Sequence, residues 1–142
     1  MSMLAEYQFT EARRGFSGIY NRVFNALTPV VIKRKQNEQV LVIRPDLEQE
    51  ILARYSLKPE VLQEDDGSVT LALDALELAV NAPTKDEAIK ALVEDLKFYA
   101  RDYIERSQLF LNSPNRRQHL PYLLRVLLCN SEAEIQSLLE LN

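Results

Sequence analysis

The residue best suited to acid–base chemistry is His119, the only histidine among 142 residues. A general base needs a partner that sets its protonation, and no carboxylate stands at motif spacing from His119, which follows Arg116 to Gln118. We therefore expect a surface or helix-capping histidine. No His/Cys group has metal-ligand spacing, and the three glycines form no phosphate-binding loop. The sequence predicts no enzyme, no cofactor and no metal site.

Three further groups that could do chemistry have simpler interpretations. Cys129 is the single cysteine and follows a leucine-rich run, so we expect a buried, unreactive thiol and no internal disulfide. The run Glu64 to Asp66 is typical of a solvated loop, because a divalent cation would need more oxygen ligands in a fixed geometry. Residues 115–119 either bind an anion or lead into the next helix.

The charge is distributed unevenly along the chain. The net charge is −4, yet residues 1–44 hold seven basic and three acidic residues, a net of +4, and the remainder holds ten basic and eighteen acidic residues, a net of −8. A basic segment ahead of an acidic body suggests nucleic acid as the partner of the first part and a basic partner for the second. A chance fluctuation along a short chain is the alternative.

The first segment has apolar residues at i, i+4 and i+7, which predicts one helix. That apolar face consists of Ala12, Phe16, Ile19, Val23 and Leu27. The opposite face carries Arg14, Asn21, Arg22 and Asn25, with Arg13 at its flank. Arginine suits phosphate and guanine, and asparagine suits adenine, so this face predicts DNA contacts. A solvated polar face is the alternative.

Residues 30–32 and 40–43 read as two β-branched strands joined by a polar turn, a hairpin. Lys33, Arg34 and Lys35 at the end of the first strand join Arg13, Arg14, Asn21 and Arg22 as predicted DNA contacts, on charge and spacing. Both strands carry consecutive apolar residues. One face can take the helix, and the other suggests a second subunit, so we expect a homodimer.

Beyond a predicted helix at 46–55, residues 56–67 read as a linker and residues 68–142 as a folded, mainly helical domain. Two short strands are expected at 69–73 and 76–82, with helix as the alternative because of their Leu and Ala content. Helices are expected from Thr84 to about 111, over 121–129 and from Ser131 to 141. Thr84 and Ser131 each begin a capping box. The expected core packs one helix against the next, with Leu92, Leu96, Phe98 and Tyr103 on one side and Leu123, Leu124 and Leu127 on the other.

Four pieces of the first segment, in this order and spacing, resemble the Phd/YefM (prevent-host-death) antitoxin family. They are residues 9–13, Phe16 with Val23, residues 29–34 and residues 40–42, and the resemblance covers roughly residues 5 to 55. It implies a helix-on-hairpin fold that dimerises through its sheet and binds operator DNA, and it matches Arg13 and Arg34 to the family's basic positions. The turn at 35–37 departs from the Arg/Lys-Gly turn of many members.

Together these patterns predict an α+β chain in which residues 1–55 bind DNA and dimerise and residues 68–142 bind a toxin or another partner. The expected function is a cytoplasmic type II antitoxin that represses its own operon and neutralises a protein toxin, which could be a basic RNA-cleaving protein. No apolar stretch is long enough for a membrane span. The alternatives are a solitary transcription regulator with a ligand-sensing or stabilising C-terminal domain, and a structural scaffold.

Overall fold

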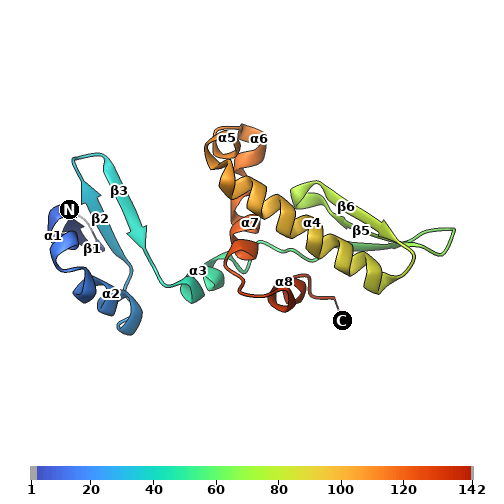
Figure 1. The fold of residues 1–142 in the computed structure, drawn as a ribbon, viewed down its shortest axis with the longest axis horizontal. Coiled ribbons are helices and arrows are strands. Elements are labelled where there is room, and N and C mark those ends of the chain that lie inside the picture. Colours follow the sequence, from blue (N-terminus) through green and yellow to red (C-terminus); the bar gives the residue numbers. More distant parts are fainter. Residues whose placement is uncertain (1–2, 142) are drawn as a thin grey trace. The chain divides into compact units, whose positions relative to one another are not determined.

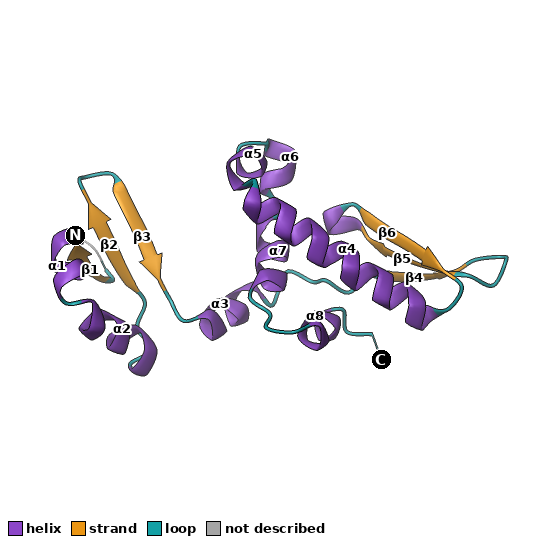
Figure 2. Ribbon diagram, in the orientation of Figure 1, coloured by secondary structure: helices purple, strands orange, loops and turns teal. Residues whose placement is uncertain are grey.

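The computed structural model describes residues 3–141, so residues 1, 2 and 142 at the ends of the predicted domains lie outside the described part. The fold is mixed α+β, with two three-stranded sheets among the described residues. Its internal contacts divide the chain into a first unit that ends at Ile51 and a second unit that begins at Leu52. Figures 1 and 2 show the elements of each unit.

The first unit is built on a sheet in the order β1-β2-β3. Strands β2 (Val30–Arg34) and β3 (Glu38–Val42) form the antiparallel pair that the sequence predicts as a hairpin. Strand β1 (Ala5–Gln8) lies parallel to β2, a pairing that the sequence analysis did not anticipate. Strand β3 is therefore an edge of this sheet.

Two helices cover one face of this sheet, where one long helix was predicted (Figure 2). Helix α1 (Phe9–Arg14) ends at Gly15, which also precedes helix α2 (Phe16–Asn25). The break changes the predicted apolar face. Ile19 and Val23 are buried against Val30, but Phe16 and Leu27 are about half exposed.

The second unit begins within helix α3 (Pro45–Leu52) and contains an antiparallel sheet in the order β4-β5-β6. Its strands are β4 (Glu60–Gln63), β5 (Val69–Leu73) and β6 (Leu78–Ala82), with a short 3-10 turn η1 (Asp74–Leu76) before β6. Residues 56–67, predicted as a linker, instead contain β4 and the fully buried Leu57. Every β4 side chain is exposed, so the strand lacks the apolar alternation by which a sequence reveals a strand.

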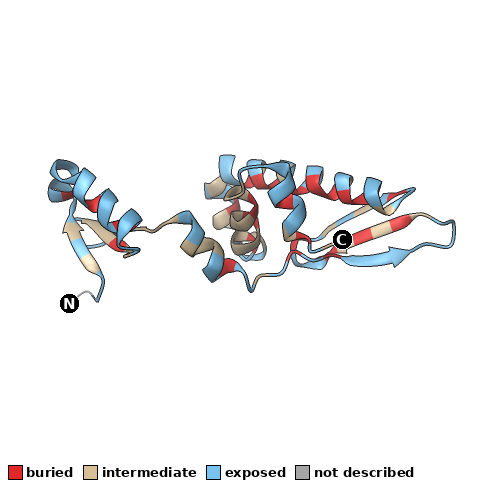
Figure 3. Cartoon of the chain, turned by 90° about the horizontal axis from the view of Figure 1, so that it is seen from below, coloured by how far each residue is buried: buried red, intermediate tan, exposed pale blue. Residues whose placement is uncertain are grey.

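Helix α4 (Lys85–Glu105) packs on β5 and β6 and is the central element of this unit (Figures 1 and 3). The hydroxyl of Thr84 accepts a hydrogen bond from the Glu87 amide at 3.2 Å, which forms the N-cap half of the predicted capping box. The helix ends at Glu105, earlier than predicted. The short helices α5 (Ser107–Leu111) and α6 (Pro114–Arg117) follow it.

Helices α7 (Leu120–Leu127) and α8 (Glu132–Leu138) contribute further side chains to the core beneath α4. Leu92, Leu96, Tyr103 and Leu123 are completely buried, as predicted, and Leu124 and Leu127 are partly buried. Phe98 was wrongly predicted in the core, because it is 74% exposed. The buried face of α4 runs through positions 92, 96, 99 and 103, and at 100° per residue this spacing turns position 98 outward.

Candidate functional site

Arg13 and Arg14 are the last two residues of α1, and both are exposed. The helix begins with a hydrogen bond from the Gln8 amide to the Glu11 carboxylate at 3.3 Å and ends at Gly15. Basic side chains in a last turn interact favourably with the helix dipole. Neither arginine has an ion pair or a hydrogen bond to another side chain within residues 3–141, so both cations are available to an external anion.

The two predicted DNA contacts of α2 differ in their surroundings. Asn21 is exposed and has no hydrogen bond from its side chain to the described part of the chain. Arg22 is also exposed, but its Nη1 donates to the Tyr7 hydroxyl at 3.0 Å, which ties α2 to β1. Because the tyrosine is neutral, this contact orients the guanidinium without cancelling its charge.

The three basic residues at the end of β2 all have acidic neighbours. Nε and Nη2 of Arg34 donate to Oε1 of Glu38 at 3.0 and 2.7 Å, and Nζ of Lys35 lies 3.7 Å from Oε2 of the same residue. Nζ of Lys33 lies 3.8 Å from Oε1 of Glu6 on β1. Surface ion pairs contribute only about 0–1 kcal/mol, so a phosphate could displace them at small cost. Within residues 3–141, the predicted set therefore falls into three groups: Arg13, Arg14 and Asn21 have no side-chain partner, Arg22 contacts a tyrosine, and Lys33, Arg34 and Lys35 lie beside carboxylates.

His119 is buried, which corrects the prediction of a surface or capping residue. It precedes α7, but its side chain makes no cap. Its Nδ1 lies 2.7 Å from the Tyr99 hydroxyl, and the two rings meet edge to face. Arg116 donates from Nη1 to the same hydroxyl at 2.8 Å. The sequence suggested an exposed His119 because the residues before it are polar. Its burial depends on the turn between α6 and α7, which points the side chain into the core and which the sequence does not reveal.

The surroundings of His119 favour a neutral ring. Burial lowers the pKa of His119, and Arg116 lowers it further, while Glu77 acts in the opposite direction. No carboxylate of the described residues hydrogen-bonds to the imidazole. The ring is therefore held in the core as an uncharged hydrogen-bonding group.

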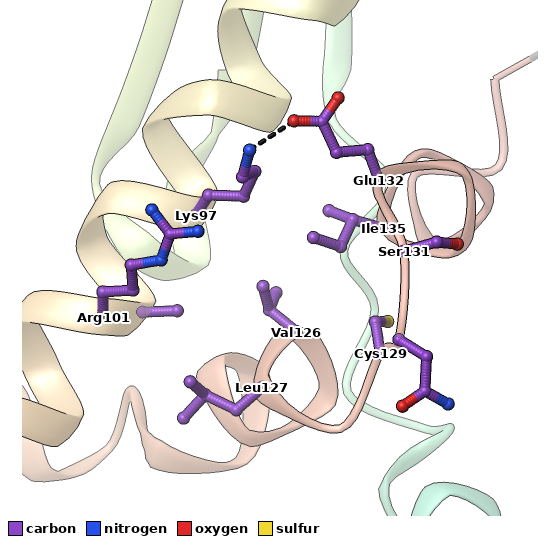
Figure 4. A pocket seen from close by; sticks show the side chains of 10 residues that line it. Lys97, Arg101, Val126, Leu127, Cys129, Ser131, Glu132 and Ile135 are labelled. Atoms are coloured by element: carbon purple, nitrogen blue, oxygen red, sulfur yellow. Dashed lines mark hydrogen bonds and ion pairs between the residues drawn. The ribbon is translucent and has the colours of Figure 1, made fainter.

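A second cluster lies between α4, α7 and α8 (Figure 4). Lys97 forms ion pairs with Glu94, at 3.4 Å, and with Glu132. The Cys129 thiol is partly buried and donates to the Arg125 carbonyl at 3.3 Å. Burial raises the pKa of this thiol, which keeps it protonated and slow to react. Residues 3–141 contain no group of three or more His, Cys, Asp or Glu side chains placed to hold a metal ion.

A third feature, which the sequence analysis missed, is a pocket on the outer side of α4. The exposed Phe98 and Asp95 line it together with Glu77, and Leu76 and Leu78 contribute apolar wall. The helical spacing of the buried positions around Phe98 could have shown that this side chain faces outward.

No helix of residues 3–141 is both long enough and apolar enough to cross a membrane.

Comparisons with known proteins agree on one class. A family described as the antitoxin of RelE/RelB toxin–antitoxin systems matches residues 3–141. A crystal structure from Syntrophomonas wolfei subsp. wolfei, described as the antitoxin part of a proposed toxin/antitoxin system, is similar to this chain, with 31% sequence identity and a TM-score of 0.84. The similarity covers 94% of this chain and 95% of that one. No curated protein matches the chain.

Proposed function

The chain belongs to the family of antitoxins of RelE/RelB toxin–antitoxin systems, and from this premise we propose that it neutralises a protein toxin and represses its own operon as a DNA-binding dimer. The first unit would bind the operator, in the manner of the Phd/YefM family that it resembles. The second unit would bind the toxin, which could be a basic RNA-cleaving protein.

The observation that carries the DNA-binding part is the pair of exposed, unpartnered arginines at the end of α1. DNA affinity comes largely from cations that neutralise phosphates. Arg13 and Arg14 can do this without breaking an internal ion pair. Asn21 and Arg22 on α2 add an amide and a guanidinium that suit base edges. Lys33, Arg34 and Lys35 would join after exchanging their carboxylate partners for phosphates.

Dimerisation is proposed through the open edge of the first sheet. Strand β3 has no outer neighbour within the described residues, and its side chains Val40 and Leu41 are 60% and 53% exposed. A hollow lined by Phe9, Ile32 and Val40 lies beside this edge. An open strand edge with apolar side chains is a template for pairing. A second copy on this edge would cover these side chains and would match a two-fold symmetric operator.

The toxin-binding part rests on the charge and packing of the second unit. Residues 52–142 hold ten basic and fifteen acidic residues, a net of −5. Their core is extensive, with Leu71, Leu92, Leu96 and Tyr103 completely buried. A preformed acidic surface of this kind suits a basic partner without a large ordering cost.

Two measurements with the full chain test this function. In a reporter assay, the chain should repress the promoter upstream of its own gene. Expression of the chain should also restore growth to cells that express the product of the adjacent reading frame. Repression without any growth rescue would instead support the solitary regulator, and rescue without repression would remove the DNA-binding half of the proposal.

A further inference from the structure

The outer side of α4 presents a large aromatic side chain to solvent beside a hollow. Phe98 is 74% exposed, in a unit whose other aromatic side chains on α4, Tyr99 and Tyr103, are buried. The hollow next to Phe98 is walled by Leu76 and Leu78 from the turn before β6 and the start of that strand. An exposed aromatic residue beside a pocket is the kind of group that dominates protein–protein interfaces.

Two carboxylates at the same pocket form no ion pair with the described residues. Glu77 and Asp95 both line it and are exposed. Neither carboxylate has a hydrogen bond or an ion pair to another side chain in residues 3–141. The next acidic residues of α4 on either side, Glu94 and Asp102, are engaged with Lys97 and Arg106. The pocket thus combines apolar walls with two exposed carboxylates that form no ion pair among the described residues.

Among the described residues, the one cation in the pocket lining, Arg116, is turned toward two aromatic rings. It donates to the Tyr99 hydroxyl at 2.8 Å, and its guanidinium lies 5.6 Å from the centre of the Tyr99 ring and 5.8 Å from that of Phe110. These neutral contacts leave its charge in place, so the lining holds two negative charges and one positive charge. Because Arg116 is partly buried while Glu77 and Asp95 are exposed, the exposed rim of the pocket is mainly negative.

We infer that this pocket receives an arginine or lysine side chain of the toxin, with the aliphatic stem on Phe98 and Leu78 and the cation between Glu77 and Asp95. A long basic side chain fits both halves of the site, because its methylene groups cover apolar surface while its charge stays at the rim. The same cation would also face the ring of Phe98. The inference rests on the proposed function, which supplies the toxin as the partner.

The test measures binding of the full chain to the purified product of the adjacent reading frame, by calorimetry at low and high salt. Phe98→Ala should weaken binding about tenfold or more. The double variant Glu77→Gln with Asp95→Asn should weaken binding at low salt and reduce its salt dependence. Ile104→Ala and Glu105→Gln are the matched controls, since both residues are exposed on α4 outside the pocket and should leave the affinity unchanged.

The possible outcomes distinguish a failure of the pocket inference from a failure of the proposed function. Wild-type binding with unchanged affinity in the Phe98 and charge variants would overturn the inference and leave the proposed function in place. An absence of wild-type binding would reject the toxin-binding function, and the inference with it. Loss of dimer mass for Phe98→Ala in sedimentation would show that a second copy occupies the pocket, which also overturns the inference. Phe98 is exposed, so thermal unfolding of Phe98→Ala should match wild type and exclude misfolding.

Discussion

The Tyr99 hydroxyl lies 2.7 Å from Nδ1 of His119 and accepts a hydrogen bond from Nη1 of Arg116 at 2.8 Å. The guanidinium can only donate, and the hydroxyl oxygen has a second lone pair, so the Tyr99–His119 hydrogen bond fits either tautomer of a neutral imidazole. Burial and the positive charge of Arg116 lower the pKa of His119 and favour its neutral form.

Acidification should destabilise the second unit through His119. Burial keeps the pKa of His119 in the folded chain below the ordinary 6.5, so the unfolded chain takes up the proton first as the pH falls. The contribution of His119 to the free energy of unfolding is thus complete above about pH 6.5 and is lost progressively below it. Urea denaturation at about pH 7.5 and about pH 5.5 measures this loss. His119→Gln, which does not titrate, should lose part of the pH dependence, and an equal dependence in both proteins would contradict the assignment.

Removal of the Arg14 guanidinium should weaken operator binding. Arg14→Ala removes an unpartnered cation, so the slope of log K against log salt should flatten by about one unit if the contact is to phosphate. Fluorescence anisotropy with the upstream promoter fragment measures the slope. Arg101→Ala, which removes an exposed arginine of α4, is the matched control and should not change it. Unchanged binding in both the Arg13→Ala and Arg14→Ala variants would place the DNA surface elsewhere.

The β3 edge should be the dimer contact. Leu41→Lys places a charge on a side chain that is 53% exposed, so it should leave the fold intact while two copies of the charge repel across the interface. Sedimentation at about micromolar concentration should show a dimer for wild type and a monomer for the variant. Ile51→Lys serves as the control, because Ile51 is equally exposed but lies on α3 outside the sheet. If Leu41→Lys is as dimeric as wild type, the β3 edge is not the dimer contact.

The second unit should be folded before any toxin binds. Buried large side chains each contribute roughly 1.5–3 kcal/mol, and α4 alone buries eight residues. Amide hydrogen exchange on the protein without toxin should therefore show strong protection from Glu87 to Tyr103 and around Leu123 to Leu127. Exchange at random-coil rates throughout the second unit would instead indicate a segment that folds only when it binds the toxin.

The features of this fold that could be predicted from the sequence are those that depend on residues close together in the chain. Thr84 and Ser131 each accept the amide hydrogen bond of a helix N-cap, which is one half of the predicted capping boxes, because a cap depends only on residues within one turn. The hairpin at β2 and β3 followed from its β-branched runs. Strand β4 was missed because its side chains are all exposed and show no apolar alternation. The pairing of β1 was missed because its partner β2 is distant in the sequence, and side-chain patterns do not encode such a pairing.

The candidate sites were less predictable for a related reason. His119 was expected on the surface because its sequence neighbours are polar, and its burial depends on the turn between α6 and α7. Phe98 was expected in the core together with the other large apolar side chains of this helix, although its helical position faces outward. The basic residues of the first unit were identifiable by type. Which of them are free of internal partners, as Arg13 and Arg14 are, depends on strand register and on where α1 ends.

The burial of Leu57 bears on how such proteins could be recombined. The second unit begins at Leu52, the last residue of α3, and only five residues later Leu57 enters its core, shortly before β4. A crossover between two antitoxin genes in the stretch 56–67 would separate β4 or Leu57 from the residues they pack against. A crossover within α3, after the first sheet and before Leu52, would keep both cores whole. Exchange of operator specificity between lineages should therefore leave its junctions inside α3, and not in the acidic loop that follows β4.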